Sequence, residues 1–423
     1  MAAVRFVRRA FFSLVLIQFC IPLTPTVAGD ASPPDKAVAG LEQSGAQEKA
    51  LEELKNRFGL FPYDESTRKK LIKAYAAMGE KQLKSKLFDE AAESFENARK
   101  LSPENQDYGV LKGIALYGGK HYDAAIMELE QARRNGGDTL PILLYLGRTY
   151  YDTGELAKAV EVWDMALALE PGNKPIRDMA DKARREMSIE SHMDRDYGSK
   201  FVISYDEGTR SDLADAVLDA LEGAYNRVGY DLSHYPDSNI PVILYTKKDY
   251  RSVTSGPEWS GGLYDGKVRL PIGGTREITP LLRGVLSHEY THVVVGELTK
   301  GNCPVWLNEG LAEFEGRKEF DTPLNDLEHA VKTVALIPFK TLEKSIASLD
   351  SGKAALAYQQ SYSLVSFMIS TYGMYKVRDI LINLGKGMGS EAAIAVAFAD
   401  YRLDLNGILQ EWREHIRKTY GSD

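Results

Sequence analysis

The sequence predicts two folded parts in series, a helical solenoid and then an α+β domain. Three observations support this multidomain α and α+β organisation. A self-similar pattern recurs every 34 residues between about 65 and 188, which is typical of stacked helical hairpins. From residue 201 onward, short apolar runs of strand length alternate with helical stretches. A charged junction near 193–199 separates the two patterns, so we place the boundary there, with domains at 47–192 and 193–423.

Residues 1–28 have the pattern of an export signal. Three arginines precede an apolar run at 10–23, and a small-residue cleavage pattern follows at 26–28. We therefore expect an exported bacterial protein, periplasmic or secreted, with an uncleaved N-terminal anchor as the alternative. Residues 29–46 are rich in Ala, Gly, Ser, Pro and charge, which predicts a disordered linker.

Composition limits the possible functions of the mature chain. Loss of residues 1–28 removes three arginines and no acid, so the formal net charge falls from −8 to −11. We do not expect so acidic a protein to bind nucleic acid. Cys303 is the one cysteine left after residue 28, which excludes an internal disulfide. No further stretch is long and apolar enough to span a bilayer.

The 34-residue period is carried by related segments and by small residues. Three similar segments begin at Phe88, Tyr122 and Leu156. Three alanines keep the same spacing: Ala98, Ala132 and Ala166. This pattern resembles tetratricopeptide repeats, in which small residues let paired helices approach and the stack is the stable unit. The resemblance implies a groove for a peptide or a partner protein; a spacer or brace for the following domain is the alternative.

The second domain begins with a strand–helix–strand–hairpin order. We predict strands at Phe201–Tyr205 and Pro241–Tyr245, separated by a helix from Ser211 to about Gly229. Leu263–Pro271 reads as a hairpin that turns at an Asp-Gly pair.

The segment 279–316 carries the residues for which we expect chemistry. His288, Glu289 and His292 form an H-E-x-x-H pattern, and Thr279-Pro280 is typical of a helix start. On a helix, both imidazoles lie on one face and can bind one metal ion, while Glu289 can take a proton from metal-bound water. Two histidines and a carboxylate suit zinc and leave a fourth position open.

A second helical pattern follows with two acidic residues four positions apart, Glu309 and Glu313. Together with the H-E-x-x-H pattern, from which a 16-residue gap (293–308) separates Glu309, it resembles the gluzincin zinc metallopeptidases, above all the bacterial branch called peptidase MA-like. The resemblance implies a thermolysin-like α+β fold, Glu309 as the third zinc ligand, and Glu313 as the carboxylate that orients His288 through its outer ring nitrogen. Such a partner fixes the tautomer and makes the histidine a better ligand.

The same resemblance implies two further parts of the site. Its tyrosine that steadies the oxyanion matches Tyr358 best and Tyr362 second, with simple helix packing as the alternative for both. Its edge strand above the metal corresponds to Gly262–Gly274, which we expect to form a substrate wall by strand addition. An edge merely protected by Lys267 and Arg269 is the alternative.

The sequence therefore predicts a zinc-dependent peptidase that hydrolyses peptide bonds in the bacterial cell envelope, with repeats that bind a partner or the substrate. The Gly-x-Met-Glu-Asn motif of the related aminopeptidases is absent, which favours an endopeptidase. Cys303 is interpreted as a packed thiol rather than a ligand. Two alternatives stay open: an inactive peptidase-fold scaffold that acts through its repeats, and a zinc hydrolase of a non-peptide amide such as cell-wall material.

Overall fold

A computed structural model gives the fold of residues 47–206, 211–237, 239–254, 262–272, 275, 277–343, 346 and 349–421. The predicted export signal and linker lie outside these described residues. The chain divides between Met187 and Ser188 into two compact units, each of which is described by itself. None of the described helices combines the length and apolarity needed to cross a membrane.

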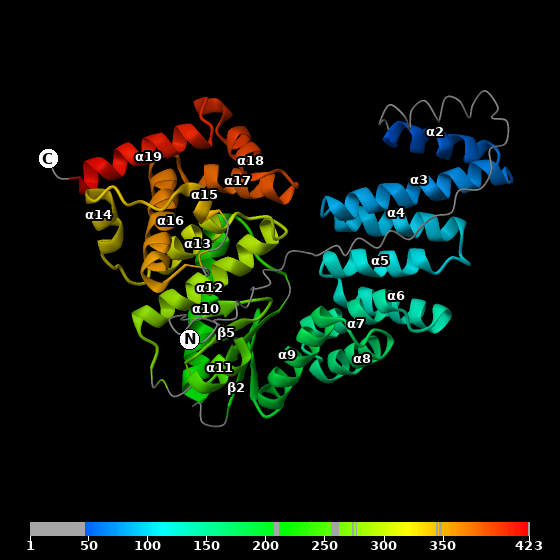
Figure 1. Cartoon of the computed structure of the whole chain (residues 1–423), viewed down its shortest axis with the longest axis horizontal. Coiled ribbons are helices and arrows are strands. Elements are labelled where there is room, and N and C mark those ends of the chain that lie inside the picture. Colours follow the sequence, from blue (N-terminus) through cyan, green and yellow to red (C-terminus); the bar gives the residue numbers. More distant parts are fainter. Residues whose placement is uncertain are drawn as a thin grey trace. The chain divides into compact units, whose positions relative to one another are not determined.

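The first unit is a stack of helices in antiparallel succession (Figure 1). Its described helices are α2 (Gln47–Leu60), α3 (Glu65–Lys84), α4 (Phe88–Leu101), α5 (Asp107–Gly118), α6 (Tyr122–Gly136), α7 (Leu140–Asp152), α8 (Leu156–Leu169) and α9 (Lys174–Glu190). The predicted segments at Phe88, Tyr122 and Leu156 begin α4, α6 and α8. The predicted helical solenoid is therefore confirmed.

Small residues bring the paired helices together. The three repeat alanines are at most 2 % exposed. The structure adds a second periodic feature, a glycine whose Cβ would lie no more than 2.8 Å from a large buried side chain of the next helix. The pairs are 34 residues apart: Gly79 with Phe95, Gly113 with Leu129, and Gly147 with Trp163. Each hairpin thus closes by placing a large apolar side chain directly on a helix backbone.

The second unit is mostly helical with a small mixed sheet of strand order β1-β2-β3-β5-β4. The strands are β1 (Asp194–Tyr197), β2 (Phe201–Tyr205), β3 (Ile240–Leu244), β4 (Leu263–Tyr264) and β5 (Val268–Leu270). Strands β2, β3 and β5 are parallel, and the outer strands β1 and β4 pair antiparallel to them. The sequence predicted β2, β3 and the hairpin, in which Gly266 has a φ of +103°.

The structure adds one strand that was not predicted and contradicts one alternative for the edge of this sheet. The charged junction at 193–199 has no strand pattern, but Asp194–Tyr197 form an edge strand with little burial. The alternative of an exposed edge protected by Lys267 and Arg269 is wrong, because these two residues are only 4 % and 0 % exposed. Both turn inward, because a buried carboxylate, Glu190, lies within 3.4 Å of each.

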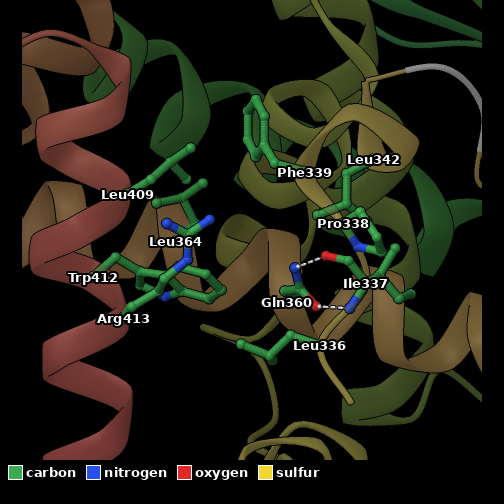
Figure 2. Close-up of a pocket in the computed structure, with 10 residues that line it drawn as sticks. All are labelled: Leu336, Ile337, Pro338, Phe339, Leu342, Gln360, Leu364, Leu409, Trp412 and Arg413. Carbon is green, nitrogen blue, oxygen red and sulfur yellow. Dashed lines mark hydrogen bonds between the residues drawn. The ribbon is translucent and has the colours of Figure 1, made fainter. Parts of the chain in front are cut away.

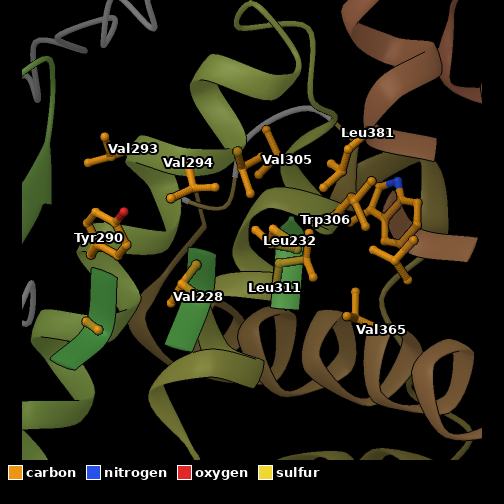
Figure 3. Close-up of a cluster of buried hydrophobic side chains, with 14 of the residues drawn as sticks. Val228, Leu232, Tyr290, Val293, Val294, Val305, Trp306, Leu311, Val365 and Leu381 are labelled. Carbon is orange, nitrogen blue, oxygen red and sulfur yellow. The ribbon is translucent and has the colours of Figure 1, made fainter. Parts of the chain in front are cut away.

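Helices surround this sheet and form most of the core. They are α10 (Ser211–Leu232), α11 (Lys247–Thr254), α12 (Pro280–Leu298), α13 (Val305–Gly316), α14 (Asn325–Lys332), α15 (Phe339–Leu342), α16 (Ser351–Tyr372), α17 (Met374–Gly385), α18 (Ser390–Ala397) and α19 (Leu405–Tyr420), with a short 3-10 turn at Ala399–Tyr401. In Figure 3, side chains of α10, α12, α13, α16 and α17 belong to one cluster of buried apolar residues. This core fixes α12 and α13, the two helices with the predicted chemistry.

Candidate metal centre

Helix α12 begins where the sequence predicts. Thr279 is the N-cap, its Oγ1 accepting a hydrogen bond from the Leu282 amide at 3.2 Å, and Pro280 is the first helical residue. His288 and His292 are one turn apart, and their ring centres are 4.8 Å apart with the ring planes at 89°. Both imidazoles therefore lie on one face of the helix.

Helix α13 brings a carboxylate to both rings. Glu309 Oε2 lies 3.6 Å from His288 Nε2 and 3.5 Å from His292 Nε2. Across the described part of the chain, these three side chains are the one group of histidines, cysteines and acids that could hold a metal ion, with ligand atoms within 4.8 Å of one another. The predicted ligand set is thus brought together in space.

Close backbone approach makes this meeting possible. A Cβ on Gly284 of α12 would lie 2.8 Å from the carbonyl oxygen of Gly316 in α13. A Cβ on Gly316 would likewise lie 2.8 Å from the carbonyl oxygen of Gly284. A Cβ on Gly310 would lie 2.5 Å from the carbonyl oxygen of Ser361 in α16. A glycine inside an apolar helix is a sequence signal of close helix packing. The sequence does not indicate which helix backbone each of these glycines contacts.

The donor set fits a divalent cation such as zinc. A carboxylate and two imidazoles face one another in a largely buried place. A positive charge among them offsets the cost of burying the ionised carboxylate. Burial disfavours protonation of His288, but the nearby carboxylates of Glu309 and Glu313 outweigh it and raise the pKa of that imidazole well above its ordinary value. Burial likewise opposes ionisation of Glu309, yet the two histidines lower its pKa. The centre thus favours an ionised carboxylate facing a positive charge.

Glu313 lies behind His288, as the resemblance implies. Its Oε1 is 3.4 Å from His288 Nδ1, and its Oε2 accepts a hydrogen bond from Arg317 Nε at 3.1 Å. Burial opposes ionisation of Glu313, but His288 and Arg317 outweigh it and lower its pKa. His292 has no such support, because its buried Nδ1 contacts no partner among the described residues.

Glu289 points from the same helix turn toward strand β4. Its side chain is only 6 % exposed, and burial is the main cause that raises its pKa. The backbone of the hairpin covers it: a Cβ on Gly262 would lie 2.6 Å from Glu289 Oε1, and the Tyr264 backbone hydrogen-bonds to the carboxylate. No sequence pattern indicates that a glycine of the expected substrate wall contacts Glu289. Gly273 and Gly274 of that wall lie outside the described residues.

The two candidate tyrosines differ in their surroundings. The ring centre of Tyr358 lies 6.4 Å from that of His288, so this side chain borders the metal centre. Tyr362 packs instead against Arg317, whose guanidinium carbon is 4.6 Å from the ring centre of Tyr362.

Cys303 is half-buried, and burial together with the charge of Glu309 raises the pKa of its thiol, which favours a neutral thiol.

A separate cavity of about 210 Å³ lies between α15, α16 and α19 (Figure 2). It is lined mainly by apolar side chains, and the Gln360 amide is already hydrogen-bonded to the backbone of Ile337. None of the predicted site residues lines it.

Two family models match the chain. The Peptidase MA superfamily model matches residues 227–418. A tetratricopeptide repeat model matches residues 77–139 and 110–174. No curated protein matches.

Several solved structures are similar to parts of the chain. The tetratricopeptide domain of Arabidopsis OM64 is 19 % identical, with 28 % of this chain and 98 % of that one covered and a TM-score of 0.27. MamA is 22 % identical, with 38 % and 88 % covered and a TM-score of 0.30. The TPR2AB domain of yeast Sti1 is 16 % identical, with 69 % and 97 % covered and a TM-score of 0.26. On the two family models, this chain carries a Peptidase MA superfamily domain at residues 227–418, preceded by tetratricopeptide repeats.

Proposed function

We propose that the domain at 193–423 is a zinc-dependent endopeptidase. The observation that carries the proposal is the convergence of His288, His292 and Glu309 beside the buried carboxylate of Glu289. Held by those three side chains, zinc would polarise a substrate carbonyl group and lower the pKa of water.

Glu289 is the proposed general base. Its pKa is raised by burial, which suits a group that accepts a proton from the attacking water and later passes it to the leaving amine. Tyr358 is the proposed donor of a hydrogen bond to the developing oxyanion, an interaction worth about 3 kcal/mol of transition-state stabilisation. Glu313 is proposed to orient His288.

The proposal extends to the fold and the substrate. We assign the domain to the gluzincin type with a thermolysin-like α+β arrangement, supported by an edge hairpin that lies against the H-E-x-x-H helix. In the described sheet β4 is an outermost strand, which is the position at which strand addition binds an extended peptide. The buried carboxylate of Glu289 beside the three grouped side chains supports activity over an inert scaffold, because a general base at this place is what the hydrolysis requires.

Export to the cell envelope and partner binding by the repeats are also part of the proposal. The pattern of residues 1–28 supports export. The tetratricopeptide repeats support an interaction with a protein, either a partner or the substrate itself.

The test compares the wild type with Glu289→Gln for zinc content and for cleavage of casein. We expect about one zinc per chain in both proteins, and a loss of cleavage of about 100-fold or more in the variant. Glu297→Gln is the matched control, because Glu297 lies on the same helix and pairs with His234. Wild type that purifies without zinc and cannot be loaded would overturn the metal assignment. Cleavage of wall polymer but not of casein would change the substrate class.

A further inference from the structure

Arg317 lies at the end of α13, one turn after Glu313, and is held from three directions. Its Nε donates a hydrogen bond to Glu313 Oε2 at 3.1 Å. Its Nη1 donates to the backbone carbonyl of Thr322 at 2.7 Å. Its guanidinium carbon lies 4.6 Å from the ring centre of Tyr362. With a side chain only 10 % exposed, this guanidinium has little freedom to move.

Glu313 divides its two oxygens between different partners. Oε2 accepts the hydrogen bond of Arg317, and Oε1 faces His288 Nδ1 at 3.4 Å. A carboxylate anchored through one oxygen cannot rotate without losing that bond, so the other oxygen keeps its direction. The direction of Oε1 in turn sets the ring orientation and the tautomer of His288.

We propose that Arg317 is a positioning residue of the metal centre, which holds Glu313 so that His288 presents Nε2 to the ion. Tyr362 belongs to the same arrangement, because its ring supports the flat face of the guanidinium. Tyr358, one turn earlier on α16, borders His288 itself. The helix α16 thus serves the centre twice, once beside the ligand and once behind it.

Lysine cannot replace arginine in this role. The contacts need two donors at fixed angles and a flat surface that packs on an aromatic ring, whereas a lysine offers one point charge on a flexible stem. A lysine keeps a positive charge beside Glu313 but lacks the second donor and the flat surface. A lysine variant should consequently lie between the wild type and a neutral variant.

The inference rests on the proposed metal centre, and its test needs no peptide cleavage. Zinc affinity is measured by competition with a chromophoric chelator for the wild type, Glu313→Gln, Arg317→Gln, Arg317→Lys and the double variant Glu313→Gln/Arg317→Gln. Outer partners of metal-bound histidines typically contribute about 10- to 100-fold in affinity, which we expect for Glu313→Gln. We expect a smaller loss, about 3- to 10-fold, for Arg317→Gln and less again for Arg317→Lys.

The double variant decides the mechanism. If Arg317 acts through Glu313, the double variant binds zinc as Glu313→Gln does, because no carboxylate remains to be held. Losses that multiply would overturn the proposal, as would wild-type affinity in Arg317→Gln. Lys318→Gln is the control, since Lys318 is the next residue and pairs with Glu315 and Asp231 instead. Its affinity should stay within about twofold of the wild type.

Circular dichroism of each variant checks that the fold is retained, and Arg317→Lys keeps the test valid if the neutral variant does not fold. Wild type that binds no zinc would overturn the metal centre and this inference together. Wild type that binds zinc but cleaves nothing would count against the proposed activity alone and leave the comparison of variants intact.

Discussion

Replacing Gly262 by alanine would place a methyl group against the proposed general base. The added Cβ would lie 2.6 Å from Glu289 Oε1, 2.8 Å from its Cγ and 2.9 Å from its Cδ, whereas ordinary contacts begin near 3.4 Å. The carboxylate or the hairpin must therefore move by about 0.8 Å. A misplacement of about 1 Å at a reacting group can reduce the rate by about 100-fold, so we expect kcat to fall about 10- to 100-fold, equal to about 1.4–2.7 kcal/mol in activation free energy.

The assay is steady-state cleavage of a peptide together with zinc content. Zinc should stay bound, because Glu289 is not among the three grouped ligands. Gly296→Ala is the matched control. Gly296 lies on α12, as Glu289 does, and its added Cβ would contact only Tyr264, at 4.0 Å. That variant should keep its activity and gain about 0.5–1 kcal/mol of stability from the helical preference of alanine. Wild-type kcat in Gly262→Ala would refute the close contact, and loss of zinc would show that the hairpin acts on the ligands instead.

Two further predictions concern stability. Glu190→Gln leaves Lys267 and Arg269 buried without their shared carboxylate and should lower the free energy of unfolding at pH 7 by about 3 kcal/mol. Burial opposes the ionisation of Glu190, but the two cations outweigh it and lower the pKa of this carboxyl below the usual 4.5. The stabilisation that Glu190 contributes is therefore complete above pH 4.5 and is lost as the pH falls through the lowered pKa of the folded protein. Urea unfolding of both proteins from pH 7 to pH 3 measures this, and a difference that does not shrink below pH 4.5 would contradict it. Val334→Gly should raise the stability by about 0.5–1 kcal/mol, because Val334 follows α14 with a φ of +54° and is 89 % exposed; in thermal unfolding, a lower melting temperature than that of Val334→Ala would contradict it.

The parts of the fold that the sequence predicts are those that depend on local periodicity. His288 and His292 share a face because a helix repeats every 3.6 residues, and the repeat helices begin where the 34-residue pattern places them. Strand β1 could not be predicted in this way, because Asp-Arg-Asp-Tyr has neither apolar alternation nor burial and is ordered by its pairing with β2.

The missed parts of the candidate site are contacts between distant segments. Arg317 looks like an ordinary surface charge until the fold brings Tyr362 of α16 against it. Gly262 is one of many glycines until β4 is placed on α12. Lys267 and Arg269 look like exposed edge charges because their partner, Glu190, is more than 70 residues earlier in the chain. No local pattern encodes which carboxylate will meet which cation.

The position of Glu190 has a consequence for how the two domains can be separated or exchanged. The helix that closes the repeat pattern, α9, runs to Glu190 and so ends inside the second unit. A cut at 193, where the repeat pattern has ended, removes the carboxylate that pairs with Lys267 and Arg269 of the hairpin. A recombination event that grafts another repeat array onto this peptidase domain would have to keep the last turn of the old one. The final turn of α9 is therefore part of the second unit, although it continues the last helix of the repeats.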